Sequence, residues 1–204
     1  MKYDKFQIDG CAFVLIEDLL PEDLVEKLDK AMKKELAWQH DDNIFKFCHY
    51  VKDRSATLQG DMFELADDQE LTELSNQLLQ HVLNFIKSEF NHEFTIEELK
   101  PIFSRERIHR YKPHYYDNAK GNLLYHKDAW MTIFYMPDAY ADEGTHFYAN
   151  EDPEQLVYTL KHKRGMIALF NGDILHAPAK MSETDTNRIV LTMQYHTHIQ
   201  DIIS

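Results

Sequence analysis

The sequence predicts an α+β fold in which helices come first and a β-sandwich or barrel follows, with the helices on one side of it. Two observations carry this prediction. Apolar residues recur at helical spacing in the first hundred residues, whereas short β-rich runs alternate with turns from residue 101 onward. The 204 residues suffice for one domain with its own core, and no repeat or composition change suggests a boundary. We therefore expect a single domain over residues 1–204, with a strand and helices in 1–100 and a β core in 101–198.

The first hundred residues are predicted to hold one strand and two helices. Residues 6–16 contain an apolar run that is typical of a strand. Pro21 stands where a helix begins, and residues 21–36 follow with an amphipathic pattern. A second apolar stripe, over residues 68–90, predicts a longer helix packed in the core. Residues 37–66 show no period, which predicts a long irregular segment that is either a lid or a surface excursion.

The remaining sequence is predicted to form about eight short strands separated by turns. Residues 117–122 are rich in turn formers, and residues 150–154 separate two runs as the loop of a hairpin does. The predicted strands are residues 102–111, 123–128, 131–136, 145–149, 156–161, 166–170, 174–176 and 188–196.

Composition excludes several classes of partner. A net charge of -13 argues against nucleic acid, because phosphate binding needs clustered lysines and arginines. The same charge means that an anionic small molecule must be held by a local cation. No apolar run is long enough to span a bilayer, and the N-terminus lacks an apolar signal region. Two cysteines, Cys11 and Cys48, indicate reduced thiols and therefore a cytoplasmic protein. From the charge and the hydropathy we expect neither a membrane nor a nucleic-acid partner. The oligomeric state stays open.

Two histidines and one aspartate form a candidate metal site. His126 and Asp128 are two residues apart in a predicted strand, so their side chains point the same way. A histidine from a distant strand, His176, would complete a two-histidine, one-carboxylate triad, which favours non-haem Fe(II) that activates oxygen. His-x-Asp alone also occurs on ordinary surface strands, so the prediction depends on the motifs that follow.

The ordered set of motifs resembles the Fe(II)- and 2-oxoglutarate-dependent oxygenases, in particular their prolyl-4-hydroxylase-like branch. The resemblance covers residues 105–197, while residues 1–100 match only in having a strand followed by helices that pack on the barrel. It implies a double-stranded β-helix (jelly-roll or cupin-like) with a catalytic β core in 101–198 and N-terminal helices that buttress it. The matching pieces are His126-x-Asp128, Phe134-Tyr135-Met136-Pro137, Glu143-Gly144-Thr145-His146-Phe147, Gly165 to Phe170, His176 and Arg188.

The resemblance also implies roles for single residues. His126, Asp128 and His176 would be the catalytic iron ligands, and Arg188 would pair with the distal carboxylate of 2-oxoglutarate in a bidentate contact that lysine cannot copy. Asp128 itself argues against halogenation, because related halogenases have a small residue in place of the aspartate.

Three further residues are expected to bind the co-substrate. Thr192 shares a strand face with Arg188, and Tyr111 and Tyr135 stand at the places of two family tyrosines. In an unbroken strand Tyr135 would face away from His126, so its role requires a bend near residues 129–130.

The resemblance implies an enzyme that consumes O2, converts 2-oxoglutarate to succinate and CO2, and hydroxylates a C–H bond. The substrate would be a small molecule, amino-acid-like or a natural product, or a peptidyl residue, covered by lids from residues 37–66 and 115–121. Two alternatives stay open: a cupin-like protein that binds metal or ligand, and a sensor protein, each without oxygenase activity.

Overall fold

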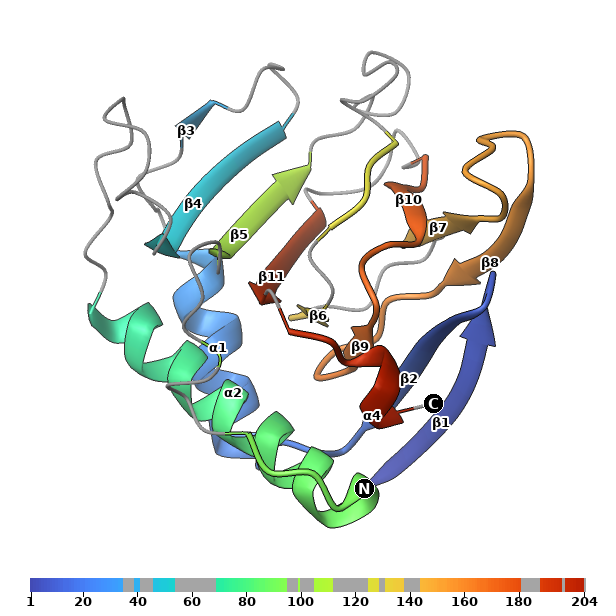
Figure 1. Ribbon diagram of the computed structural model, residues 1–204. Helices are drawn as coiled ribbons and strands as arrows, with labels where there is room; N and C mark the ends of the chain where they lie inside the picture. The colour runs from blue at the N-terminus through green and yellow to red at the C-terminus, as the bar shows by residue number, and fades with distance from the viewer. Residues whose placement is uncertain are drawn as a thin grey trace.

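The computed structural model shows a large sheet between two helices on one side and a small sheet on the other (Figure 1). The structure describes residues 1–34, 39–40, 46–53, 69–94, 99, 105–111, 125–128, 131–137, 144–180, 188–195 and 197–203. For residues 39–40, 46–53 and 105–111 it describes the backbone alone.

Over the ranges that the structure describes, the large sheet has eight strands, and every neighbouring pair is antiparallel. Strands distant in sequence are interleaved in it, so the sheet joins the N-terminal hairpin to the C-terminal strand. Its order is β1 (Lys2–Ile8), β2 (Cys11–Glu17), β9 (Ile167–Phe170), β6 (Met131–Tyr135), β11 (Arg188–Tyr195), β5 (Arg105–Tyr111), β4 (Lys46–Asp53) and β3 (Gln39–His40).

The small sheet has the order β10 (Leu175–Pro178), β7 (Thr145–Tyr148) and β8 (Leu156–Leu160). Its aromatic and aliphatic side chains pack against those of the large sheet; for example, the rings of Phe147 and Phe170 meet edge to face at 5.4 Å. Two facing antiparallel sheets around a shared core make the described residues a mostly β structure of jelly-roll type, as expected.

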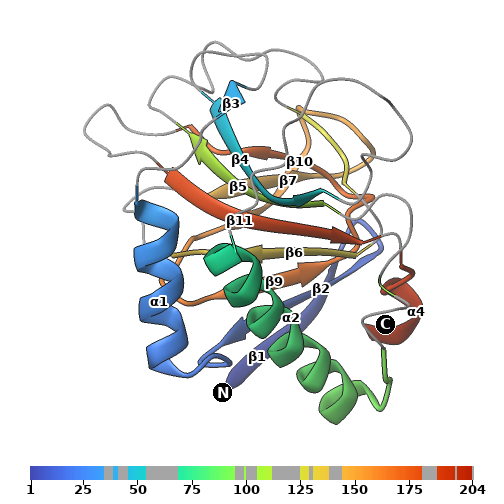
Figure 2. The same ribbon diagram turned by 90° about the vertical axis from the view of Figure 1, so that its left-hand side faces the viewer.

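Helices α1 (Glu22–Lys33) and α2 (Gln69–Phe90) lie against the opposite face of the large sheet (Figure 2). The alternation of side chains along each strand separates the two cores. In β9, Ala168 and Phe170 point toward the small sheet, whereas Ile167 and Leu169 pack with the buried faces of the helices. A short helix, α4 (Gln200–Ile203), follows β11. None of the helices described is both long and apolar enough to cross a membrane.

Most predicted elements are confirmed, including both long helices and the hairpin of β7 and β8. The N-terminal prediction was incomplete. Two strands, β1 and β2, form a hairpin around Asp9 and Gly10, whose φ angles of 50° and 77° fit the two-residue type I′ turn. The prediction of an irregular segment over residues 37–66 was wrong where β3 and β4 lie. β4 forms a strand because it pairs with β5, which lies far along the chain. That residues 1–204 form one domain stays a prediction.

Candidate metal centre and anion pocket

The two predicted histidine ligands are joined through their backbones. His126 and His176 form an antiparallel bridge in which each N–H donates to the other residue's carbonyl oxygen at 3.0 Å. The Asp128 N–H donates to the Gly172 carbonyl oxygen at 2.8 Å, in the turn between β9 and β10. Strand pairing and this turn therefore bring all three predicted ligands to one end of the small sheet.

The side chains of His176 and Asp128 make the closest contact of the group. Nδ1 of His176 lies 2.9 Å from the Ile174 carbonyl oxygen, which can only accept, so Nδ1 carries the proton. In the neutral ring, Nε2 is then an acceptor, and it lies 3.2 Å from Oδ2 of Asp128. The two side chains are 1% and 7% exposed, and Nε2 is a buried atom with no hydrogen-bond partner among the described residues. Two buried acceptors at this distance fit a cation held between them.

The third ligand completes a set that suits a divalent transition metal. Among the residues that the structure describes, His126, Asp128 and His176 each offer one ligand atom, and these atoms lie within 4.8 Å of one another. Rings of Phe134, Phe147 and Phe170 surround His176, with centroids 5.6–5.9 Å from its own. Two imidazoles and one carboxylate on a common side, with no thiolate, match the facial triad that holds non-haem iron.

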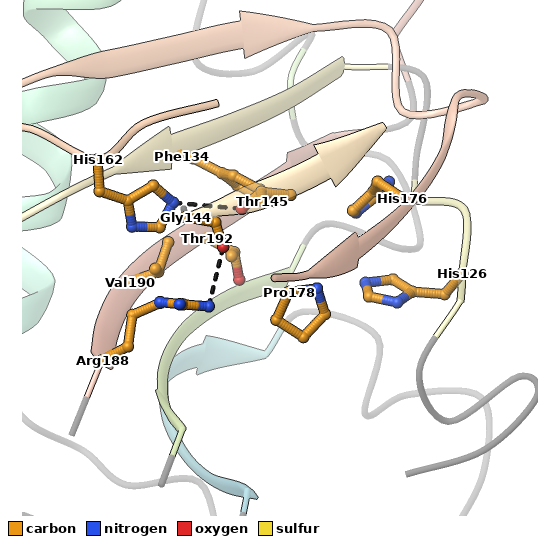
Figure 3. Close-up of a pocket in the computed structure, with 10 residues that line it drawn as sticks. All are labelled: His126, Phe134, Gly144, Thr145, His162, His176, Pro178, Arg188, Val190 and Thr192. Atoms are coloured by element: carbon orange, nitrogen blue, oxygen red, sulfur yellow. Dashed lines mark hydrogen bonds between the residues drawn. The ribbon is translucent and has the colours of Figure 1, made fainter. Parts of the chain in front are cut away.

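A pocket of about 300 Å³, its mouth included, extends from this group into the space between the sheets. Figure 3 shows His126 and His176 at one end and Arg188 with His162 at the other, and threonine and apolar side chains lie between. Within the described part of the chain, the residues that line it are His126, Phe134, Gly144, Thr145, His162, His176, Pro178, Arg188, Val190 and Thr192.

Arg188 lies buried at the far end of the pocket. It is the first residue of β11 and is 1% exposed, and its Nη1 donates to the carbonyl oxygens of Gly144 and Ala179 at 2.9 and 3.0 Å. Val190 and Thr192 follow on the same strand face, so Thr192 lines the pocket. These contacts hold the guanidinium in one place, where it can pair with a carboxylate.

Tyr135 is not in the pocket, which corrects the expected contact with the co-substrate. Its hydroxyl donates to Oδ1 of Asp29 on α1 at 3.1 Å, and Nε of Arg164 donates to Oδ2 of the same carboxylate at 2.6 Å. Burial above all, and then the Asp29 charge, raise the pKa of the Tyr135 hydroxyl well above its ordinary value. The side chain lies on the helix side because Ile133 and Tyr135 share one face of β6.

Some predictions fall outside the described residues. Tyr111 pairs with Arg188 along the backbone of β5 and β11, but its side chain is not among those described. The bend expected near 129–130, the lid at 115–121 and most of the lid at 37–66 are likewise outside them.

His162 is a pocket residue that the sequence motifs did not reveal. It follows β8, is 2% exposed, and its Nε2 lies 3.2 Å from Oγ1 of Thr145. Burial, and then the positive charge of Arg188, lower the pKa of His162 to about 3, so the ring is neutral. The His162 ring lies against Gly144, which belongs to one of the family motifs, and this neighbouring glycine is the signal that could have pointed to His162.

The fold is shared with solved oxygenase structures. An oxidoreductase of the 2OG-Fe(II) oxygenase family from Burkholderia pseudomallei matches with a TM-score of 0.62 at 13% identity, over 90% of this chain and 83% of its own. Dioxygenase for auxin oxidation 1 from Arabidopsis thaliana, solved with 2-oxoglutarate, gives 0.57 at 13% identity over 91% and 82%. A Pseudomonas putida prolyl-4-hydroxylase gives 0.54 at 10% identity over 91% and 92%.

Sequence comparison adds nothing to this likeness. No protein-family model matches the chain, and no curated protein is significantly similar to it. At 10–13% identity the three structures establish the fold alone. The chain thus has the fold of 2OG-Fe(II) oxygenases, and its own residues must support any activity.

Proposed function

We propose that this protein is an Fe(II)- and 2-oxoglutarate-dependent dioxygenase that hydroxylates a C–H bond of a small molecule or a peptidyl residue. One observation carries the proposal: His126 and His176, which group with Asp128 as a candidate triad, line one end of a pocket, and a buried Arg188 lines the other. A 2-oxo dicarboxylic acid has a chelating group at one end and a carboxylate at the other, so its chemistry matches both ends.

The chain's own residues would hold and orient the reactants. His126, Asp128 and His176 would bind Fe(II), which supplies oxygen activation coupled to decarboxylation of 2-oxoglutarate to succinate and CO2. Arg188 would pair with the distal carboxylate and so direct the 2-oxo acid group toward the metal end. The packed rings of Phe134 and Phe147 beside His176 would exclude water on that side.

Binding is the first test. Anaerobic Fe(II) and 2-oxoglutarate added to the protein should give a weak visible charge-transfer band, and calorimetry should show that the acid binds only when metal is present. Arg188→Met should weaken 2-oxoglutarate about 100-fold by removing a buried charge-assisted pair, with metal affinity kept. Asp173, exposed in the turn beside Asp128, gives a matched control, because Asp173→Asn should change neither affinity.

Turnover is the second test. In air the protein should consume oxygen and release succinate, and mass spectrometry of metabolite or peptide pools should find a product heavier by one oxygen atom. A protein that binds metal and 2-oxoglutarate but never releases succinate would be the cupin-like binding or sensor protein instead. His126→Ala should abolish succinate release, and continued turnover in that variant would contradict the metal assignment.

A further inference from the structure

His162 lies at the end of the pocket opposite His126 and His176, as Figure 3 shows. It is 2% exposed and lines the pocket together with Arg188 and Thr145. The proposed function assigns no role to this imidazole, although it lines the same end of the pocket as Arg188.

Packing fixes the ring in place. A Cβ built on Gly144 would lie 2.0 Å from Cδ2 and 2.5 Å from Nε2 of His162, so the ring occupies the space of a side chain at 144. The carbonyl oxygen of the same glycine accepts from Nη1 of Arg188. His162 and Arg188 therefore both contact one residue, and the absence of a side chain at Gly144 gives the ring its place at this end of the pocket.

The ring is also an uncharged hydrogen-bonding group. Its Nε2 is 3.2 Å from Oγ1 of Thr145, while burial and Arg188 keep the imidazole neutral. A neutral ring leaves the guanidinium of Arg188 as the cation of this end of the pocket, which suits an acid with a single distal carboxylate. When Nε2–H donates to Thr145, the threonine hydroxyl proton is directed elsewhere, and the pocket is where it can meet an acceptor.

We propose that His162 determines co-substrate specificity: its ring limits the 2-oxo dicarboxylic acid to five carbons, and its Nε2 orients the Thr145 hydroxyl toward the distal carboxylate. The proposal rests on the proposed oxygenase function and names a residue for its co-substrate subsite. One additional methylene against a pocket wall changes binding by about 10- to 200-fold, so the His162 ring would disfavour the six-carbon acid by a factor of this order.

The test measures binding of 2-oxoglutarate and its six-carbon homologue 2-oxoadipate to the anaerobic Fe(II)-loaded protein by calorimetry. The native protein should prefer 2-oxoglutarate by at least about tenfold. His162→Ala should lower this preference about tenfold or more, by weakening 2-oxoglutarate and strengthening 2-oxoadipate. His162→Gln, whose amide can replace Nε2 beside Thr145, should bind 2-oxoglutarate within about threefold of the native protein. His81→Gln, on α2, is the matched control and should change nothing.

Thr145→Val separates the two parts of the proposal and avoids a large cavity. It should weaken both acids about equally, because it removes a hydroxyl from the shared distal carboxylate and leaves the end wall intact. Equal losses for both acids in His162→Ala, or an unchanged preference, would overturn the specificity role. Unchanged 2-oxoglutarate affinity in Thr145→Val would overturn the hydrogen-bond role. If the native metal-loaded protein binds neither acid, the proposed function itself is wrong, and the role of His162 is wrong with it.

Discussion

Nε2 of His176 and Oδ2 of Asp128 face each other at 3.2 Å although each is an acceptor in the neutral-ring state. Such a pair is unfavourable in a buried place unless a proton or a metal ion lies between the two atoms. Without either, the contact has a free-energy cost that a bound metal ion would remove, and this cost can be measured by substitution.

Asp128→Asn tests this contact at the level of a single atom. An asparagine amide can donate to Nε2 of His176, so the metal-free variant should be as stable as the native protein or more stable, by up to about 1 kcal/mol. Because the amide is a poor metal ligand, Fe(II) affinity should fall at least about 100-fold. Thermal unfolding in chelator and metal titration measure the two effects. A metal-free variant clearly less stable than the native protein would contradict the acceptor pair.

His162 predicts a dependence of stability on pH. Its folded pKa is about 3, below the ordinary value of 6.5, so the unfolded chain binds more protons between these values. Stability should therefore be complete above pH 6.5 and fall as pH decreases below it, with a slope of at most about 1.4 kcal/mol per pH unit from this group.

The measurement is urea unfolding between pH 4.5 and 7 for the native protein and for His162→Gln. Carboxylates titrate in the same range, but the difference between the two proteins isolates the histidine. Equal slopes in both would show that His162 protonates as easily in the folded protein as in the unfolded chain.

Elements differ in how far the sequence alone could predict them. The two-residue period of β11 placed Arg188 and Thr192 on one face, and the structure has both in the pocket. The same period places Tyr135 on the other face, as the structure has it, whereas the family motif predicts a contact with the co-substrate. Local chemistry also indicates the turn at Asp9–Gly10, because Asp-Gly is a strong signal for a two-residue hairpin loop.

Long-range pairing explains the elements that could not be predicted. β4 has no clear alternation, and its hydrogen bonds go to β5, more than fifty residues away in sequence. His162 belongs to no motif, and its burial follows from the way β8, β11 and Gly144 meet in space. Such positions depend on the tertiary arrangement, which no local pattern of one sequence contains.

Helix α2 gives a prediction at the level of an element. Leu78 is fully buried in the cluster that the helices share with the large sheet. Leu78→Ala should lower the free energy of unfolding by about 2–5 kcal/mol through lost burial and a cavity. Exposed Gln80→Ala on the same helix should change it by less than about 0.5 kcal/mol. Chemical unfolding measures the change in both variants. That the helices buttress the sheets stays a prediction. Unfolding of helices and sheets in a single transition would support it, and loss of the helices in a separate transition would contradict it.

At the scale of the whole molecule, the candidate site spans the two sheets. His176 belongs to the small sheet, whereas Arg188 and Thr192 belong to β11 of the large one. A 2-oxo acid bound at both ends would therefore connect the sheets, and it would favour the folded state over the unfolded chain.

Ligand-dependent melting checks this connection. Fe(II) with 2-oxoglutarate at 100 times its Kd should stabilise the protein by about 2.7 kcal/mol beyond metal alone. Arg188→Met at the same concentrations should lose most of that increment and keep the effect of the metal. An increment that persists in Arg188→Met would place the acid elsewhere.

The backbone bridge between His126 and His176 has a consequence for how the protein would acquire the proposed metal ion. Two of the three ligands are fifty positions apart in sequence, yet two main-chain hydrogen bonds set their spacing without any ion. The entropy of closing that loop is spent when the chain folds, so the ion meets a preorganised pair. Metal capture would then mark the moment in refolding when segment 125–128 joins β10, and a rapid-mixing experiment with a coloured divalent ion could time that event.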